Sequence, residues 1–410
     1  MQNYDVVIVG AGITGLTAAL ALKDSDLSVL VIDAQAADAP VTDQPELRVS
    51  AINLASQTIF QRLGIWQHVV EQRLQDYQSM QVWEQDSFAH IGFSHQEIQR
   101  SHLGSIVENQ VLRLALLKGL EGINNIELAE PARIENLVFG QSESFLTLSN
   151  GNSFTAKLVV GADGANSYVR RVANLPFTFW DYDHIALVAT VRTELAHDNC
   201  ARQVFTADGP LAFLPLFEPN LCSIVWSQRN QQAETLLALP EREFNQRLQV
   251  TLDNKLGKCE LQSQRVSYPL TMRYCRQWVK DRVMVIGDAA HTIHPLAGQG
   301  ANLGIADAAA LAQTLGELQA NRKDIGLAKN LRKLERWRKA QAMKMIVSME
   351  GFKRLFAGSN PVKKLIRDIG LSAANQAGPV KRDMIKLAAG LEGELPELAK
   401  QASQIKGHSD

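Results

Sequence analysis

The sequence predicts a mixed α/β fold, with α+β character, in which a discontinuous parallel-sheet domain carries an inserted antiparallel sheet and precedes C-terminal helices. Three observations support this fold class. Short apolar runs end in glycine-rich turns at residues 5–10, 157–161 and 282–287, as buried parallel strands do. Alternating strand patterns fill residues 75–100 and 177–275. Beyond about residue 335 the pattern is helical throughout.

The composition allows an enzyme and argues against a nucleic-acid partner. The 410 residues are enough for two or three domains with a large buried core. A formal net charge of -1 and a pI of about 6.8 offer no attraction for nucleic acid. The four cysteines contain no CxxC pair and indicate reduced thiols. We find no secretory-signal pattern and no apolar run long enough for a membrane span, so we expect a cytoplasmic protein.

The first βαβ unit carries a dinucleotide-binding fingerprint. "DVVIV" at 5–9 predicts a strand, "ITGLTAALALKDS" a helix, and "LSVLVID" a second strand ending on Asp33. Between them "GAGITG" places Gly10, Ala11, Gly12 and Gly15 in G-x-G-x-x-G spacing. The first glycine allows a tight turn, the second lets a pyrophosphate approach the backbone, and the third lets helix and strand pack closely. A ligand-free glycine turn is the competing interpretation.

Two later glycine-rich loops favour FAD over NAD. "GADGANSYVR" and "GDAAHTIHPLAGQGANLG" follow the apolar runs "KLVV" and "RVMVI". The carboxyl ends of parallel strands meet at one edge of a sheet, so three such loops can converge on one extended cofactor. A plain NAD dehydrogenase does not require the second and third loops.

The domain organisation follows from these changes of pattern. We expect a discontinuous cofactor-binding domain from residues 1–75, 101–176 and 277–335, and a substrate domain from 76–100 and 177–276. A C-terminal helical region takes residues 336–410. "RVSAINLASQTIFQRLGIW" predicts a turn leading into a helix that ends near Gly64, and the Asn-Gly in "FLTLSNGNSF" predicts a hairpin.

The three glycine signatures together resemble those of the FAD-dependent aromatic hydroxylases. Within that family, "LRVSAIN", "IVEN", "FWDYDHIALVATVRTE", "RQVF" and "LAFLPL" are similar to the ubiquinone-biosynthesis hydroxylases, most of all to the VisC type, which acts on 2-octaprenylphenol. The resemblance extends along essentially the whole chain. It implies a Rossmann-like FAD-binding domain of the aromatic-hydroxylase type.

The resemblance also implies roles for individual residues. Asp33 binds the adenosine ribose, Arg48 lies against the phosphates or the flavin, and Asp288 hydrogen-bonds the ribityl chain. Asn109 contacts the flavin or ribityl chain, with Gln110 as an adjacent competitor. The other residues implied in cofactor binding are Arg113, Asp163, Gly164 and, in the segment running under the isoalloxazine ring, Pro295, Gly298, Gln299, Gly300, Ala301 and Asn302.

The reaction implied is hydroxylation of a prenylated phenol. FAD is reduced by NADH or NADPH, O2 is the co-substrate, and oxygen adds at the flavin C4a position before it is transferred to the ring. Water must be excluded for that transfer to succeed. The aromatic and apolar segment Phe213, Leu214, Pro215 and Leu216 either lines the substrate site or is ordinary core. A small soluble phenol, a flavin reductase or halogenase, and an inactive flavin-stabilised scaffold subunit are the alternatives.

The spacing of Asp288, His291 and His294 raises the question of a metal site. We expect none, because the loop is broken by Pro295 and no third ligand motif is visible. Hydrogen bonds that stabilise the loop explain the two histidines better. His294 and Pro295 are the only candidates for a catalytic role beside the flavin, and the general base remains unassigned.

Residues 338–386 contain 11 basic and three acidic residues. Interleaved apolar residues would suit contact with an anionic membrane surface, peripheral to the inner membrane, where a prenylated substrate resides. Contact with other ubiquinone-biosynthesis proteins, a homo-oligomer interface or a solvated helical face would account for the same charges.

Overall fold

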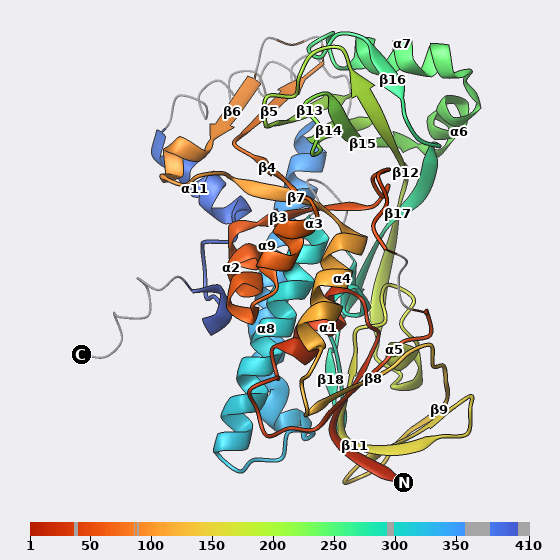
Figure 1. Ribbon diagram of the computed structural model, residues 1–410, viewed down its shortest axis with the longest axis vertical. Coiled ribbons are helices and arrows are strands. Elements are labelled where there is room, and N and C mark those ends of the chain that lie inside the picture. Colours follow the sequence, from red (N-terminus) through yellow and green to blue (C-terminus); the bar gives the residue numbers. More distant parts are fainter. Residues whose placement is uncertain (37–39, 86, 88–89, 293–298, 357–377, 401–410) are drawn as a thin grey trace.

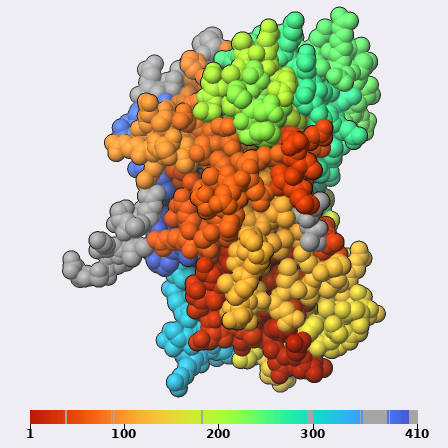
Figure 2. Space-filling view, viewed as in Figure 1, coloured from red at the N-terminus to blue at the C-terminus, as the bar shows by residue number. Residues whose placement is uncertain are grey.

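The computed structural model describes the chain except residues 37–39, 86, 88–89, 293–298, 357–377 and 401–410. Two lobes lie at opposite ends of the long axis, and the strands β12 (Phe177–Thr193) and β17 (Val266–Cys275) run between them (Figure 1). A middle layer of red and orange segments separates the lobes on the face shown in Figure 2.

One lobe contains an eight-stranded sheet whose central strands are parallel. Its order is β18-β19-β11-β1-β2-β8, and β10 and β9 extend it from β11. The parallel pairs join β1 to both β2 and β11, β2 to β8, and β11 to β19. The strand bounds are β1 Gln2–Val9, β2 Val29–Ile32, β8 Ile126–Ala129, β9 Ile134–Phe139, β10 Ser144–Leu148, β11 Ser153–Gly161, β18 Val279–Lys280 and β19 Val283–Val285.

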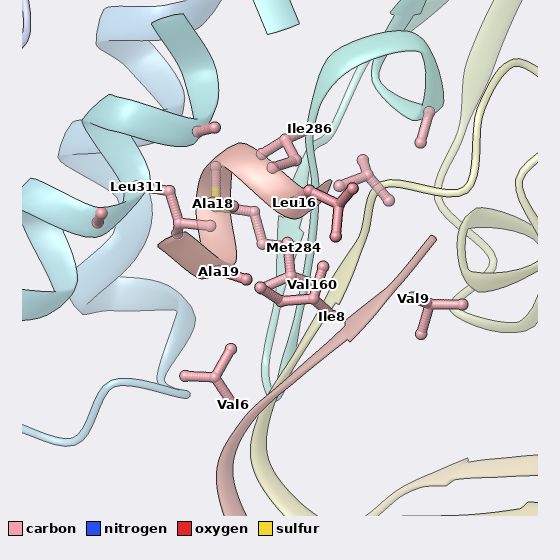
Figure 3. Packing of buried hydrophobic residues seen from close by; sticks show 14 of the residues in the cluster. Val6, Ile8, Val9, Leu16, Ala18, Ala19, Val160, Met284, Ile286 and Leu311 are labelled. Atoms are coloured by element: carbon pink, nitrogen blue, oxygen red, sulfur yellow. The ribbon is translucent and has the colours of Figure 1, made fainter. Parts of the chain in front are cut away.

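Helices α1 (Ile13–Leu20), α4 (Asn109–Leu120) and α8 (Gln299–Ala320) pack on this sheet, with α1 between the other two. Figure 3 shows Leu16, Ala18 and Ala19 of α1 close to Ile8, Val160 and Met284 of the strands. Leu311 of α8 reaches the same cluster, and all of these side chains are buried. This core holds the carboxyl ends of β1, β11 and β19 in place.

The middle layer contains a small antiparallel sheet in the order β3-β7-β4. The expected turn at "RVSAIN" was wrong, because residues Val49–Asn53 form strand β3 and pair with β7 (Gly104–Glu108). The expected helix follows as α2 (Leu54–Leu63): the Asn53 side chain caps its start and Gly64 ends it. The remaining elements here are β4 Gln75–Tyr77 and α3 Trp66–Gln72.

The other lobe is built on a nine-stranded sheet in the order β20-β17-β12-β15-β14-β13-β5-β6, with β16 paired to β12. Helices α6 (Asn230–Ala238) and α7 (Glu241–Thr251) cover one face of it. Between Asp181 and His184 the β12–β17 register shifts at a bulge. The remaining strand bounds are β5 Ser79–Glu84, β6 His90–Ser94, β13 Cys200–Thr206, β14 Gly209–Pro215, β15 Leu221–Arg229, β16 Cys259–Leu261 and β20 His291–Thr292.

The C-terminal part is helical where it is described. Helix α9 (Ala328–Phe356) packs along α8, and α11 (Gly378–Ala388) lies near the 3-10 helix η1 (His95–Ile98). The short elements are α5 Tyr168–Val172, η2 Gly287–Ala289 and η4 Glu397–Ala399. No helix in the described ranges is both long enough and apolar enough to cross a membrane.

Candidate functional site

Three glycine-containing turns lie side by side at the carboxyl edge of the parallel sheet. β19, β11 and β1 are neighbours there, and backbone hydrogen bonds join Ile286 N to Gly161 O and Ala162 N to Val9 O, at 2.9 and 2.8 Å. Gly287 approaches Thr14 of α1 so closely that a Cβ at Gly287 would lie 2.9 Å from the Thr14 hydroxyl oxygen. The sheet therefore brings together the loops that the sequence places about 150 and 275 residues apart.

The first turn is tightly packed on one side and open on the other. Gly10 has φ +107°, and a Cβ on Gly15 would lie 1.9 Å from the Gly10 carbonyl oxygen. A Cβ on Gly12 would meet no atom within 4 Å. Gly12 is the N-cap of α1 and no side chain caps this helix, so its first N–H groups face the open space. Such a helix end suits an anion.

Asp33 and Arg113 hold the peptide groups of this turn. The Asp33 Oδ2 accepts from Ala11 N at 2.5 Å, and its Oδ1 accepts from Gln35 N at 2.8 Å. Arg113 Nε donates to Ala11 O at 2.8 Å, and its Nη2 donates to Glu130 Oε2 at 2.7 Å. The two charged side chains thus fix the turn itself, and contact of Asp33 with a ribose remains a proposal.

Arg48 and Asn109 lie together where β3 meets the start of α4. Asn109 N donates to Arg48 O at 3.0 Å, and Ser50 Oγ donates to Asn109 Oδ1 at 2.7 Å. The exposed Arg48 side chain has its guanidinium carbon 5.8 Å from the centre of the Tyr268 ring. Because Tyr268 belongs to β17, Arg48 reaches from the middle layer toward the nine-stranded sheet.

Asp163 and Gly164 form the second turn. Asp163 Oδ2 accepts from Tyr168 N and Val169 N, at 2.6 and 3.1 Å, and so binds the first two N–H groups of α5, while Ser167 is the N-cap of this helix. The other oxygen, Oδ1, is buried and has no hydrogen-bond partner in the described part of the chain. Most buried polar atoms in folded proteins have a hydrogen-bond partner, so Asp163 Oδ1 is available to accept a hydrogen bond from a ligand.

Asp288 follows Gly287 in the third turn, where Gly287 adopts φ +58°. Its side chain is exposed to solvent. Desolvation raises the pKa of Asp288, against the lowering effects of His291 and Arg48. The Asp288 carboxyl group therefore lies within electrostatic range of the exposed Arg48 guanidinium.

The start of α8 completes this edge. A Cβ on Gly300 would meet nothing within 4 Å. Asn302 is buried; its Oδ1 accepts from Asn53 N at 3.0 Å and its Nδ2 donates to Ala51 O at 2.8 Å. Both ends of this amide are therefore engaged by β3. The candidate residues His294, Pro295 and Gly298 lie outside the described residues, and Gln299 and Ala301 belong to the first turn of the helix.

His291 points into the protein interior. Its Nε2 donates to Asp307 Oδ2 at 2.6 Å, and its ring lies 5.1 Å from that of Trp278. The first histidine of the D-x-x-H-x-x-H spacing is thus a buried hydrogen-bonding residue. Within the described ranges no group of three or more His, Cys, Asp or Glu side chains is placed to hold a metal ion.

The expected substrate segment divides between two faces of β14. Phe213 is buried with Leu187, Trp226 and Phe244 in the core under α6 and α7. Leu214 and Leu216 instead pack with Ala51 and Ile106 of the middle layer, and Pro215 is buried at the strand end. Strand alternation places Phe213 and Pro215 on one face of β14 and Leu214 on the other. Leu214, together with Leu216 beyond the strand end, is therefore the candidate for a substrate wall.

Sequence reasoning missed two charged groups that support the site. Asp307 on α8 and Arg338 on α9 are both buried and joined at 2.7 Å. A single acid inside the apolar run "LGIADAAALAQ" was the signal available for Asp307. Arg338 carried no such signal, because it lies among several other basic residues.

The residues present fit a cofactor with a pyrophosphate group. The open space over Gly12, the start of α1 without a side-chain cap and Asp163 Oδ1, which has no hydrogen-bond partner among the described residues, lie at one edge of the sheet. The first two suit phosphate oxygens, and the third suits a hydroxyl or amide donor. An extended molecule with both chemistries is required to use all three.

Comparisons with known proteins agree with this chemistry. A family model described as a FAD binding domain matches residues 3–345. The 3-demethoxyubiquinol 3-hydroxylase of Escherichia coli is 35% identical over 391 residues, which cover 95% of this chain and 99% of that protein. The mitochondrial ubiquinone biosynthesis monooxygenase COQ6 of Danio rerio is 32% identical over 437 residues, covering 95% of this chain and 90% of that protein.

A solved structure shows the same fold. The p-nitrophenol 4-monooxygenase of Pseudomonas putida superposes with a TM-score of 0.78 at 19% identity, covering 96% of this chain and all of that one. At this identity the similarity concerns the fold alone.

Proposed function

The chain belongs to the FAD binding domain family and is a FAD-dependent monooxygenase, and from this premise we propose that it hydroxylates the ring of a prenylated phenol in ubiquinone biosynthesis. The reaction proposed is the conversion of a 2-octaprenylphenol to the 2-octaprenyl-6-hydroxyphenol. The observation that carries the proposal is the similarity along 95% of the chain to two hydroxylases named for ubiquinone and its precursors.

The proposed cofactor contacts follow the geometry of the sheet edge. The open space over Gly12 and the N–H groups of α1 would receive the pyrophosphate. Asp163 Oδ1 and Asp288 would accept from hydroxyl groups of the ribityl chain or ribose, and Arg48 would balance negative charge at the flavin end. FAD bound there supplies the redox chemistry, taking electrons from NADH or NADPH and delivering them to O2.

The apolar layer between the lobes supplies the proposed phenol site. Leu214 of β14, with Leu216 and Phe217 in the turn that follows it, packs against Ala51 and Tyr77 of the middle layer. These side chains would keep water from the reacting ring, which the hydroxylation requires. Arg48 approaches Tyr268 at the same junction, so the proposed cofactor and phenol sites adjoin.

The basic C-terminal segment contributes less exposed charge than its composition indicates. Arg338 is buried against Asp307, Lys339 donates to Arg276 O at 2.6 Å, and Lys381 pairs with Glu97 at 3.0 Å. Peripheral contact with a membrane or with other ubiquinone-biosynthesis proteins therefore rests, in the described part, on a smaller exposed set: Met343, Lys344, Val347, Arg382, Lys386 and Leu387.

The experiment that tests the substrate class compares phenols with and without a prenyl tail. FAD-loaded protein is given NADH or NADPH, O2 and either phenol or 2-prenylphenols with one to three isoprene units in detergent. We expect kcat/KM to rise with tail length, because each added apolar group buries more area. Equal kcat/KM for phenol and the prenylphenols would contradict the proposal and favour a small soluble substrate.

A pair of variants locates the phenol. Leu214→Ala should raise KM for the prenylphenol several-fold and leave FAD affinity unchanged, because Leu214 lies on the proposed substrate wall. Phe213→Ala should instead lower the free energy of unfolding by about 3–5 kcal/mol, as a cavity in the core does. An unchanged KM in Leu214→Ala would remove this face of β14 from the site.

A further inference from the structure

A buried charge cluster joins the C-terminal helix α9 to the third glycine turn. Asp307 of α8 accepts from Arg338 Nε at 2.7 Å through Oδ1. Its Oδ2 accepts from His291 Nε2 at 2.6 Å and from Gly287 N at 3.1 Å. The side chains of Asp307, His291 and Arg338 are 1%, 1% and 3% exposed. One carboxylate thus binds both ends of the turn that contains Asp288.

Helix α9 also hydrogen-bonds the backbone of residues 276–278, which lie behind this turn. Glu335 Oε1 accepts from Trp278 N at 2.8 Å, and Lys339 Nζ donates to Arg276 O. The Trp278 ring is fully buried and packs against the His291 ring. Two residues one helical turn apart on α9, Glu335 and Lys339, therefore bind the segment behind Gly287 and His291.

The charge of Arg338 favours the ionised form of Asp307. Burial acts to raise the pKa of the Asp307 carboxyl, but the charges and hydrogen bonds of His291 and Arg338 outweigh it and hold that pKa below its usual value. An ionised carboxylate is the better acceptor for the Gly287 N–H. Without the guanidinium, the carboxylate would be left buried with His291 as its one remaining side-chain partner in the described structure.

We propose that Arg338 is a positioning residue of the flavin site: through Asp307 it fixes the Gly287–Asp288 turn in the orientation that presents Asp288 to the cofactor. Helix α9 then supports the cofactor site through the Arg338–Asp307 pair. This inference rests on the proposed contact between Asp288 and FAD. It is independent of which phenol is hydroxylated.

The test measures FAD binding to apoprotein rather than activity. Arg338→Met keeps the length and apolar stem of the side chain and removes its charge, and Arg338→Lys restores the charge. Arg336→Met changes an exposed arginine of the same helix and serves as the matched control. For each protein we would measure the FAD Kd by flavin-fluorescence titration, the Tm of the apoprotein, and the visible circular dichroism of the flavin at saturation.

We expect Arg338→Met to raise the FAD Kd by roughly tenfold or more and to change the flavin dichroism, because a buried charged partner has been lost. Arg338→Lys should recover part of both effects, and Arg336→Met should match the wild type. An Arg338→Met protein with the wild-type Kd and dichroism would overturn the inference, even if its Tm were lower. A wild-type protein that does not bind FAD would instead overturn the proposed function.

Asp307→Asn provides a second route if Arg338→Met does not fold. The amide keeps one acceptor oxygen but removes the charge that Arg338 pairs with, so the FAD Kd should rise as in Arg338→Met. In the Asp307→Asn background, Arg338→Lys should have no further effect on the Kd. Independent effects of the two substitutions would contradict a shared path to the turn.

Discussion

The first glycine turn follows β1 and the third follows β19 in the same sheet, but the two turns are stabilised differently. At Gly10–Gly15 the shape comes from the backbone, where glycines allow close approach and leave open space beside the start of α1. At Gly287–Asp288 the shape comes from side chains, through the buried Asp307, His291 and Arg338. The first turn should therefore be sensitive to the volume of a substituent, and the third to its charge.

In each turn, some features serve the stability of the fold and others serve the proposed binding of FAD. Within the first turn, Gly15 faces protein atoms and Gly12 faces open space. A larger side chain at Gly15 should therefore destabilise the fold, and one at Gly12 should instead block the proposed FAD site. In the third turn, the carboxyl group proposed to serve the cofactor is unfavourably placed when no cofactor is bound, since its pKa is raised by desolvation. Function and folding then make opposite demands on Asp288.

Gly15→Val should have the largest effect on folding. Its Cβ would lie 1.9 Å from the Gly10 carbonyl oxygen, so β1 and α1 must move apart. We expect a loss of about 3 kcal/mol or more in the free energy of unfolding, measured by urea denaturation. Gly316→Ala in α8 is the control, because its Cβ meets nothing within 4 Å; it should raise the value by about 0.5–1 kcal/mol. Equal stability of Gly15→Val and the wild type would contradict the packing described.

Gly12→Val should abolish most FAD binding while sparing the fold. Gly12 has φ -77° and ψ -179°, which a valine adopts without strain, and its Cβ would enter open space. The apoprotein should stay within about 1 kcal/mol of the wild type, the cost of a poorer N-cap. The FAD Kd should rise by about 100-fold, because the side chain occupies the space proposed for the pyrophosphate. A yellow Gly12→Val protein with full FAD content would move the pyrophosphate elsewhere.

Asp288→Asn should have the smallest effect on stability, and in the stabilising direction. A raised pKa in the folded state means that the wild-type apoprotein loses stability as pH rises above the ordinary value of 3.8. The amide removes this loss, so the variant should be more stable at pH 7, with the gap closing as the pH falls toward 4. The gain should be below about 1 kcal/mol, because solvent reaches the carboxyl group.

The measurement for Asp288→Asn is urea unfolding of both apoproteins at the two pH values, together with FAD titration at pH 7. FAD affinity should fall in the variant while stability rises. A variant that is less stable at pH 7 and more nearly equal at pH 4 would show that the carboxylate is stabilised in the folded protein, contrary to the account.

The local parts of the fold were predictable from sequence and the long-range parts were not. The first βαβ unit and the Asn-Gly hairpin of β10 and β11 depend on short-range spacing, and both are confirmed. Strand β3 was missed because "VSAIN" is short and its partner β7 lies more than 50 residues further on. Alternation along β14 predicted two faces, but only the placement of α6 and α7 shows that Phe213 belongs to the covered one.

The candidate site divides in the same way. The spacing of the glycines predicts the first turn, and the apolar strand patterns before each glycine-rich loop predict all three turns. The Asp307–Arg338 pair joins two helices across 31 residues, and no periodicity links one acid to one of many arginines. The likeness of the three signatures to aromatic hydroxylases gave the cofactor, and the family match agrees with it.

The most direct test of the central claim is hydroxylation under oxygen-18 gas. FAD-loaded protein is mixed with NADH or NADPH and a 2-prenylphenol, and the product is analysed by mass spectrometry. The account predicts a catechol that carries one oxygen-18 atom, formed in proportion to the NAD(P)H consumed. Oxidation of NAD(P)H that yields only hydrogen peroxide, with the phenol recovered unchanged at every tail length, would contradict it.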